Sequence, residues 1–254
     1  MNFENILLEK KDGVAKLIIN RPPLNILNID TLVEMNEALA KLRTDDEVKV
    51  VVITAAGNRA FSAGVEVKDH LGDKLPKMVE VFNKLFISLI AVDKPTIAVV
   101  NGIALGGGCE VIAGCDMAIA SEKAQFGQPE IKLGIYPPPA SVLFPRLMGR
   151  KKAFELILSG DSIDAKEAER IGLINKAIPE EELEKAADEF INRFLANSGL
   201  ALSQARRALY RNFDLGFHQA MEITAIDSVA VMASENGVEG LTAFVEKRKP
   251  VWKR

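Results

Sequence analysis

The run Val48–Thr54 constrains the fold of this chain more than any other stretch of the sequence. It is β-branched and almost entirely apolar, which is typical of a strand covered on both faces. Val14–Ile19, Thr96–Val100 and Asp116–Ala120 are further predicted strands, and stretches with helical periodicity separate them. Strands that alternate with helices need crossover connections, so the sequence predicts an α/β fold with a mainly parallel sheet.

Helical periodicity is clearest in Thr31–Leu42, where apolar residues recur at helical spacing. Thr31 and Glu34 stand at the separation of a capping box. A second helix is predicted over Leu75–Ala91 and a helix entry over Cys109–Ala113. Gly57–Gly64, by contrast, is predicted to be a loop.

The second half of the chain differs, because from Lys151 onward the periodicity is nearly all helical. Asp164 and Glu167 form a helix start signal, and Glu180–Leu195 is a long amphipathic run. The sequence contains no internal repeat and no low-complexity linker. We therefore divide the chain into an α/β core at residues 1–195 and a helical C-terminal region at residues 196–254 that belongs to the same unit.

The overall composition excludes several classes of protein. The chain has 254 residues, which suffices for one large domain. Hydrophobic residues make up 48% and charged residues 26% of the chain, as in a soluble globular protein. The net charge of −3 argues against nucleic acid or an anionic membrane as the partner.

Neither a metal site nor secretion is indicated by the sequence. Cys109 and Cys115 are too few for a disulfide framework and lack the spacing of zinc ligands, and no ligand pattern surrounds His70 or His218. No cationic segment with a following cleavable apolar stretch opens the chain. The least charged window, Pro95–Cys109, is too short to span a membrane. We expect a cytoplasmic protein that holds no metal.

The segment Asn101–Glu110, NGIALGGGCE, contains a glycine triplet at a strand-to-helix junction. Glycine costs backbone entropy, so the triplet indicates close approach of the backbone to another group. Amides at a helix start are unpaired donors, and the helix dipole favours negative charge there. This arrangement suits an oxyanion that develops on a carbonyl oxygen, although a tight turn packed against the sheet explains the glycines equally well. The spacing matches neither a phosphate loop nor a dinucleotide-binding turn.

Two glutamates lie in largely uncharged surroundings: Glu110 follows the glycine triplet, and Glu130 follows Pro129. Desolvation raises the pKa of a carboxyl group toward neutral pH, which suits general acid–base catalysis. Each glutamate taken alone is explained at least as well as an acidic residue at an exposed helix start. The stretch Ala60–Glu66 is by itself explained as an ordinary loop after a strand.

Several short segments follow one another in an order that matches a known family. They are Asn20-Arg21-Pro22 with Asn25, Phe61-Ser62-Ala63-Gly64, Lys94-Pro95 with Asn101-Gly102, Gly106–Glu110, Phe126–Glu130 and Phe244–Arg248. On these segments, which extend over essentially the whole chain, the sequence resembles the enoyl-CoA hydratase/isomerase, or crotonase, family.

The resemblance implies a crotonase-type spiral core of stacked ββα and βαβ turns, a helical C-terminal trimerisation region, and a homo-oligomer that is a trimer or hexamer. In this family two backbone amides hold the thioester oxygen of an acyl-CoA, and here they fall on Val65 and Gly107. Hydratases of the family use two glutamates, which fall on Glu110 and Glu130. One group must accept a proton from the attacking water and the other must deliver a proton to carbon. We assign the base to Glu110 and the proton donor to Glu130.

The resemblance also implies where coenzyme A binds, as part of the substrate and without a separate cofactor. The residues expected to contact it are Arg21, Ala60, Phe61, Ser62, Ala63, Phe244 and Lys247. The loop residues are expected near the adenine. The others, with the C-terminal pair coming from the same or an adjacent subunit, are expected to hold the phosphates and the pantetheine arm, since phosphate requires a positive partner.

Two departures from the family pattern bear on the acyl group. In Ile135–Ser141, IYPPPAS, prolines replace a glycine-rich stretch, so backbone donors are missing and the wall is stiffer. Gly64–His70 also departs from the usual pattern. Both changes resemble the cyclohexa-1,5-diene-1-carbonyl-CoA hydratases of anaerobic benzoyl-CoA degradation. A rigid acyl pocket with Tyr136, Pro138 and His70 suits a flat ring, although Tyr136 is equally explained as a core residue and His70 more simply as a loop residue.

The leading hypothesis is therefore an acyl-CoA hydratase, a hydro-lyase that adds water to a conjugated enoyl- or dienoyl-CoA thioester, with the cyclic dienoyl thioester favoured. A straight-chain 2-enoyl-CoA hydratase of fatty-acid β-oxidation differs only in the acyl group. A double-bond isomerase would use one glutamate, while the other would be structural. A catalytically silent CoA-binding or RNA-binding member of the family is disfavoured by the net charge and by the presence of both glutamates.

Overall fold

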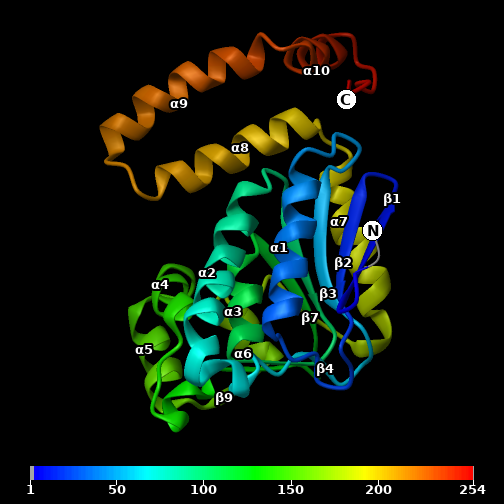
Figure 1. Cartoon of the computed structure of the whole chain (residues 1–254). Helices are drawn as coiled ribbons and strands as arrows, with labels where there is room; N and C mark the ends of the chain where they lie inside the picture. Colours follow the sequence, from blue (N-terminus) through cyan, green and yellow to red (C-terminus); the bar gives the residue numbers. More distant parts are fainter. Residues whose placement is uncertain (1–2, 254) are drawn as a thin grey trace.

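A large and a small sheet organise the fold (Figure 1). In the computed structural model, which describes residues 3–253, the larger sheet has the strand order β1-β2-β3-β5-β7-β10. β1 is antiparallel to β2, and all the other neighbours are parallel. The strands are β1 (Ile6–Lys11), β2 (Val14–Ile19), β3 (Val50–Ala55), β5 (Thr96–Val100), β7 (Met117–Ser121) and β10 (Lys176–Ile178). The predicted α/β class with a mainly parallel sheet is confirmed.

The smaller sheet repeats the order of the larger one, as β4-β6-β8-β9. Its strands are β4 (Ala60–Ser62), β6 (Ile103–Leu105), β8 (Gln125–Gly127) and β9 (Ser162–Asp164). Three successive turns of the chain each give one strand to each sheet and then a helix, and these helices are α2 (Leu75–Ala91), α3 (Gly107–Gly114) and α4 (Pro138–Leu147). The chain is thus a spiral of stacked turns, as the family resemblance implied.

The short strands correct two expectations from the sequence. The predicted loop Gly57–Gly64 contains β4, and the nearly all-helical second half contains β9 and β10. Each of these strands has only three residues, too few to establish an alternating pattern that can be recognised in the sequence.

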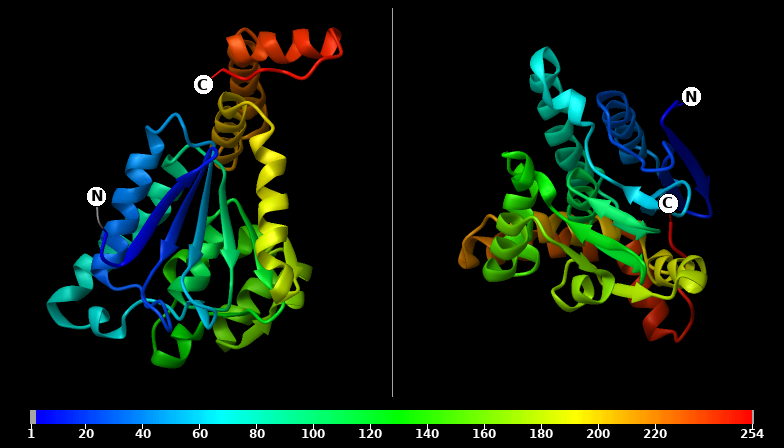
Figure 2. Two further views of the ribbon diagram at one scale, coloured as in Figure 1. Left: turned by 90° about the vertical axis from the view of Figure 1, so that its right-hand side faces the viewer. Right: turned by 90° about the horizontal axis from the view of Figure 1, so that it is seen from below.

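The larger sheet is covered on both faces, as the apolar run at β3 predicted. Val51 and Ile53 belong to the main core cluster, which also contains buried residues of α1 (Ile29–Arg43) and α2. Val50 and Val52 face the other way, into a second cluster with residues of α7 (Leu183–Leu195). In the left-hand view of Figure 2, α1 and α7 lie on opposite sides of the strands.

The start of α1 differs from the prediction. Asn28 caps this helix, because its side-chain oxygen accepts from the Thr31 backbone N–H at 3.0 Å. The capping box of Thr31 and Glu34 is therefore wrong. Glu34 instead accepts from the backbone amides of Glu4 and Asn5, at 3.0 and 2.8 Å, and so joins the segment before β1 to the helix.

Short helices connect the larger elements. They are the 3-10 helices η1 (Val67–His70), η2 (Gly72–Lys74), η3 (Pro129–Leu133) and η4 (Glu180–Glu182), and the α-helices α5 (Arg150–Ser159) and α6 (Ala165–Arg170). The predicted helix start at Asp164 and Glu167 is confirmed, since the Asp164 side chain accepts from the Glu167 N–H at 2.8 Å at the beginning of α6.

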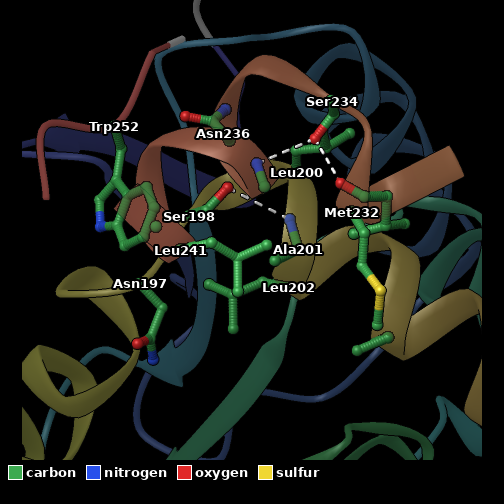
Figure 3. A pocket seen from close by; sticks show the side chains of 14 residues that line it. Asn197, Ser198, Leu200, Ala201, Leu202, Met232, Ser234, Asn236, Leu241 and Trp252 are labelled. Carbon is green, nitrogen blue, oxygen red and sulfur yellow. Dashed lines mark hydrogen bonds between the residues drawn. The ribbon is translucent and has the colours of Figure 1, made fainter. Parts of the chain in front are cut away.

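Three helices at the C-terminal end extend away from the sheets (Figure 1). They are α8 (Gly199–Asn212), α9 (Phe217–Met232) and α10 (Glu235–Val245), and we call them the C-terminal unit. Ser198 caps α8 and Ser234 caps α10 by accepting backbone N–H bonds (Figure 3). The boundary proposed between residues 195 and 196 falls at the end of α7, but the division into core and C-terminal region stays a prediction.

Candidate active site

One cavity of about 760 Å³ lies where the spiral turns meet the start of α4. The residues after β4, α2, the start of α3, η3 and the segment that leads into α4 all line it. Among its lining residues are all those that the sequence placed at the reacting centre and in the acyl pocket: Val65, His70, Gly107, Glu110, Glu130, Tyr136 and Pro138. The structure therefore brings these predicted residues together.

Glu110 lies in the first turn of α3 and is only 2% exposed, so the interpretation as an exposed helix-start residue is wrong. Its Oε1 accepts a hydrogen bond from the backbone N–H of Ala140, at 2.8 Å. Burial, with a smaller contribution from the nearby Glu130 charge, raises the pKa of Glu110 to about 8, although the Ala140 bond opposes the shift. A carboxylate with so high a pKa is a much stronger base than an ordinary glutamate.

Glu130 lies in η3 and is partly buried at the cavity, where burial raises its pKa above the ordinary value. Gln128 is fully buried beside it. With its amide nitrogen turned toward the carboxylate, Gln128 lies 3.3 and 3.1 Å from the two oxygens of Glu130. The sequence did not indicate this contact, because Gln128 stood out only as part of the Phe126–Glu130 motif.

Each glycine of the triplet lies where the Cβ atom of any other residue would collide with a neighbouring group. A Cβ atom on Gly106, whose φ is +51°, would lie 2.5 Å from Oε1 of Glu130. A Cβ atom on Gly107 would lie 2.5 Å from the Val65 side chain, and one on Gly108 would overlap the Ser62 carbonyl. The tight-packing interpretation of the triplet is therefore confirmed at Gly107 and Gly108, and Gly106 leaves room for the Glu130 carboxylate. The oxyanion interpretation stays a prediction.

Two backbone amides are left unpaired side by side. A parallel bridge at Leu27 uses the Gly64 carbonyl and the Glu66 N–H, at 2.9 and 3.0 Å, so the Val65 N–H between them points the other way. No residue of the described chain accepts from the Val65 or Gly107 N–H. A Cβ atom on Gly107 would lie 3.3 Å from the Val65 nitrogen, which shows how close the two amides are. Two such donors next to a cavity suit an oxyanion.

The opposite part of the cavity is apolar and partly open. Tyr136 is 62% exposed, so its interpretation as a core residue is wrong. His70 also lines the cavity, and its Nδ1 lies 3.0 Å from the Glu66 carbonyl. A carbonyl oxygen only accepts, so this nitrogen carries the proton. The loop that holds His70 is tied down by buried Asp69, which accepts from the Ile29 N–H at 3.0 Å.

The residues expected to bind coenzyme A are not gathered in the same way. Ala60, Phe61 and Ser62 are fully buried within the chain, whereas Ala63 lines the cavity. Arg21 donates to the Ile26 carbonyl at 2.6 Å. The C-terminal pair lies elsewhere: Phe244 is in α10 and 85% exposed, Lys247 follows that helix, and neither lines the cavity.

A second cavity, of about 440 Å³, is lined by residues of the C-terminal unit and by Trp252 (Figure 3). Its lining is mainly apolar, with Ser198, Ser234 and two asparagines as the polar side chains and no ionisable group. It therefore holds no acid–base chemistry. Among residues 3–253 no cluster of potential metal ligands occurs, and no helix there is long and apolar enough to cross a membrane.

Comparisons with known proteins point to one family. The enoyl-CoA hydratase/isomerase family model matches residues 9–254. A short-chain-enoyl-CoA hydratase of Clostridium acetobutylicum is 39% identical over 98% of this chain and 97% of its own length. A crotonyl-CoA hydratase of Syntrophomonas wolfei is also 39% identical, over 98% of both chains. The structure of an enoyl-CoA hydratase from Bacillus anthracis superposes with a TM-score of 0.94 at 32% identity, over 98% of this chain and 99% of that one.

Proposed function

Because the chain belongs to the enoyl-CoA hydratase/isomerase family, we propose that it is a hydro-lyase that adds water across the conjugated double bond of an enoyl-CoA thioester. The observation that carries the proposal is the convergence of one buried and one partly buried carboxyl group and two unpaired amides on one cavity. Hydration of a conjugated thioester needs both devices: acid–base groups for the water and donors for the carbonyl oxygen.

The amides of Val65 and Gly107 act on the thioester oxygen. When water adds to the β-carbon, the electrons of the double bond move toward the carbonyl and negative charge grows on this oxygen. Two fixed N–H donors stabilise that enolate-like state without reorganising. Loss of one such donor typically lowers the rate by ~10²–10³.

The carboxyl groups handle the water and its protons. In the proposed step, the water oxygen bonds to the β-carbon and gives a proton to the ionised Glu110, while protonated Glu130 delivers a proton to the α-carbon. The atoms of one water are thereby added across the bond. Glu110 as the base is supported by its contact with Ala140, since an N–H donor to Oε1 stabilises the anionic form.

The acyl group is proposed to be an unsaturated short chain, which is what the names of the similar hydratases describe. A cyclic dienoyl group is the second candidate. It is favoured by the stiff wall of Pro137 and Pro138 with Tyr136, which offers a flat, apolar surface to a ring.

The complete substrate site is proposed to form in a homo-oligomer, a trimer or hexamer. Phe244 and Lys247 lie outside the cavity of their own chain, so their proposed contact with coenzyme A requires an adjacent subunit. Support comes from α9, which is rich in apolar residues and buries none of them within the chain. A helix that is apolar on most sides is normally covered.

The test is hydration itself. The protein is incubated with crotonyl-CoA and, separately, with cyclohexa-1,5-diene-1-carbonyl-CoA, and the loss of the conjugated absorbance is followed. We expect loss with at least one thioester, and the ratio of the two kcat/KM values decides the acyl group. No loss with either would contradict the proposal and leave a silent CoA-binding protein; migration of the double bond without a hydroxylated product would indicate an isomerase.

A further inference from the structure

The start of α4 offers very few hydrogen-bond donors. Pro137 is its N-cap, and Pro138 and Pro139 occupy its first two positions, so none of the three has an N–H group. The first N–H of the helix is that of Ala140, and it donates to Oε1 of Glu110 at 2.8 Å. A helix start normally presents several unpaired N–H groups along its axis; here a single one is left, and it is bonded to the proposed base.

The two oxygens of Glu110 are therefore unequal. Oε1 is fixed by Ala140, whereas Oε2 has no hydrogen-bond partner among residues 3–253. Oε2 is also not among the buried polar atoms without a partner, and Glu110 lines the cavity, so this oxygen reaches the open space. One oxygen holds the carboxylate in place, and the other is available to a water molecule.

We propose that Pro138 and Pro139 are positioning residues for the hydration step: by withholding N–H groups from the first two positions of α4, they keep Oε2 of Glu110 free to take the proton of the water. This inference rests on the proposed function. The N–H groups of one helical turn point the same way, so an N–H at either position would lie close to that of Ala140. It would compete with the water for Oε2 and weaken the carboxylate as a base.

The groups around Glu110 determine whether added N–H groups raise or lower its pKa. Glu130 of η3 and the thiol of Cys109 on α3 are its ionisable neighbours, and His70 and Tyr136 line the same cavity. Helix α2 contributes apolar side chains and the neutral Asn83. Hydrogen bonds to an anion favour the anion, so each added N–H lowers the pKa of Glu110 from its raised value.

The test restores the missing N–H groups in the double variant Pro138→Ala/Pro139→Ala. The matched control is Pro145→Ala, because Pro145 lies inside the same helix but does not line the cavity. The titration of Glu110 is followed by NMR of protein labelled at the glutamate carboxyl carbon, with Glu110→Gln to assign the signal. In the double variant we expect the titration to move down by about one pH unit or more.

Turnover is measured in parallel on whichever thioester the wild-type protein hydrates. At pH 9 and above, where Glu110 is ionised in both proteins, we expect kcat of the double variant to fall about three- to tenfold, since a less basic carboxylate is a weaker base. The lower limb of the kcat/KM profile should move in the same direction as the NMR titration. Pro145→Ala should match the wild type in both measurements. A merely structural role of the prolines would lower kcat without moving the titration.

The inference is overturned if the folded double variant titrates at Glu110 like the wild type, or keeps the wild-type kcat. If the double variant does not fold, Pro138→Ala and Pro139→Ala are judged separately by the same criteria. Because the titration needs no turnover, the two failures are distinct: a wild-type protein that hydrates neither thioester defeats the proposed function, whereas an unmoved titration in an active enzyme defeats this inference alone.

Discussion

The cavity in the core and the C-terminal unit both expose apolar side chains, but in different arrangements. Around the cavity, Leu71, Leu133 and Tyr136 form an apolar rim over the buried Glu110 and the partly buried Glu130. On α9, the exposed Ile226 and Val229 belong to a helix in which no residue is buried. A concave apolar surface with a few convergent polar groups is typical of a ligand site. An extended apolar helix surface is typical of a protein–protein interface.

The difference indicates where the apolar side chains of each region are covered. In α1 and α2 one face of each helix is buried in the main core of the same chain. In α9 no such face is buried, because the C-terminal unit extends beyond the sheets (Figure 1). The core therefore buries apolar faces of its helices within the chain, whereas α9 of the C-terminal unit buries none of its residues. If the comparison is correct, substitutions in one region affect chemistry and those in the other affect assembly.

The largest effect is expected at the carboxyl groups. Glu110→Gln and Glu130→Gln each remove an acid–base function while keeping the shape of the side chain, so kcat for hydration should fall by ~10²–10⁴. Assembly and folding should not change. The control is Glu189→Gln, at an exposed glutamate of α7. Near-normal turnover in either variant, with the protein folded, would contradict the two-carboxylate mechanism.

The same negative charge placed in the two apolar regions should have two different results. Ile226 of α9 is 72% exposed, and Ile226→Glu should dissociate the proposed oligomer, as measured by analytical ultracentrifugation, because an interface core does not tolerate an unpaired charge. Leu133→Glu at the cavity rim should leave assembly unchanged and raise KM by about tenfold, since a charge there lies where an apolar acyl group is proposed. If Ile226→Glu leaves the mass unchanged, α9 is not the interface.

The junction between the regions should contribute more to stability than its surroundings. Arg206 of α8 is 5% exposed and donates to Asp116 and to the carbonyls of Leu89 and Ile90, each at 2.6 Å. Arg206→Met leaves the partly buried Asp116 carboxylate without its cationic partner and two carbonyls without their donor, and should lower the free energy of unfolding by about 3–5 kcal/mol, measured in urea.

The matched control for this junction is the next residue along the helix. Arg207 forms a more exposed pair with Asp93, so Arg207→Met should change the free energy of unfolding by less than about 1 kcal/mol. Equal effects of the two substitutions would show that the C-terminal unit is not anchored through Arg206.

Much of the core was predictable because its pattern is repeated over long stretches. The buried β3 and the bounds of α2 follow from apolar runs and helical spacing, which reflect burial within the same chain. β1 was missed, although Asp12-Gly13 with positive φ at both residues is a hairpin turn that the sequence displays. Its exposed, charged strand has no apolar pattern of its own.

The candidate site was predictable only in part. Glu110 and Glu130 came from a resemblance, since each alone looked like a helix-start residue. The contacts that tune them did not come from the sequence: the Ala140 N–H reaches Glu110 from a segment 30 residues away, and Gln128 faces Glu130 through side-chain geometry. Such contacts depend on how the spiral turns stack, which no local pattern records.

The smallest effect is a stability difference that depends on pH. The pKa of Glu110 is raised from 4.5 to about 8 in the folded protein. Between these values the folded state keeps a proton that the unfolded chain has lost, so stability falls as the pH rises through this window. Glu110→Gln removes this penalty.

We therefore expect Glu110→Gln to be no more stable than the wild type at pH 4.5 but more stable than the wild type at pH 9, measured by urea unfolding at several pH values. Glu130→Gln should shift in the same direction, because burial also raises the pKa of Glu130. A difference that stays constant with pH would mean that Glu110 ionises as an ordinary carboxyl. A difference in the free energy of unfolding that grows with pH would mean that the ionised Glu110 in the cavity lowers stability, whereas Arg206 at the junction raises it. The proposed catalytic carboxyl groups would then be held in place by the rest of the fold.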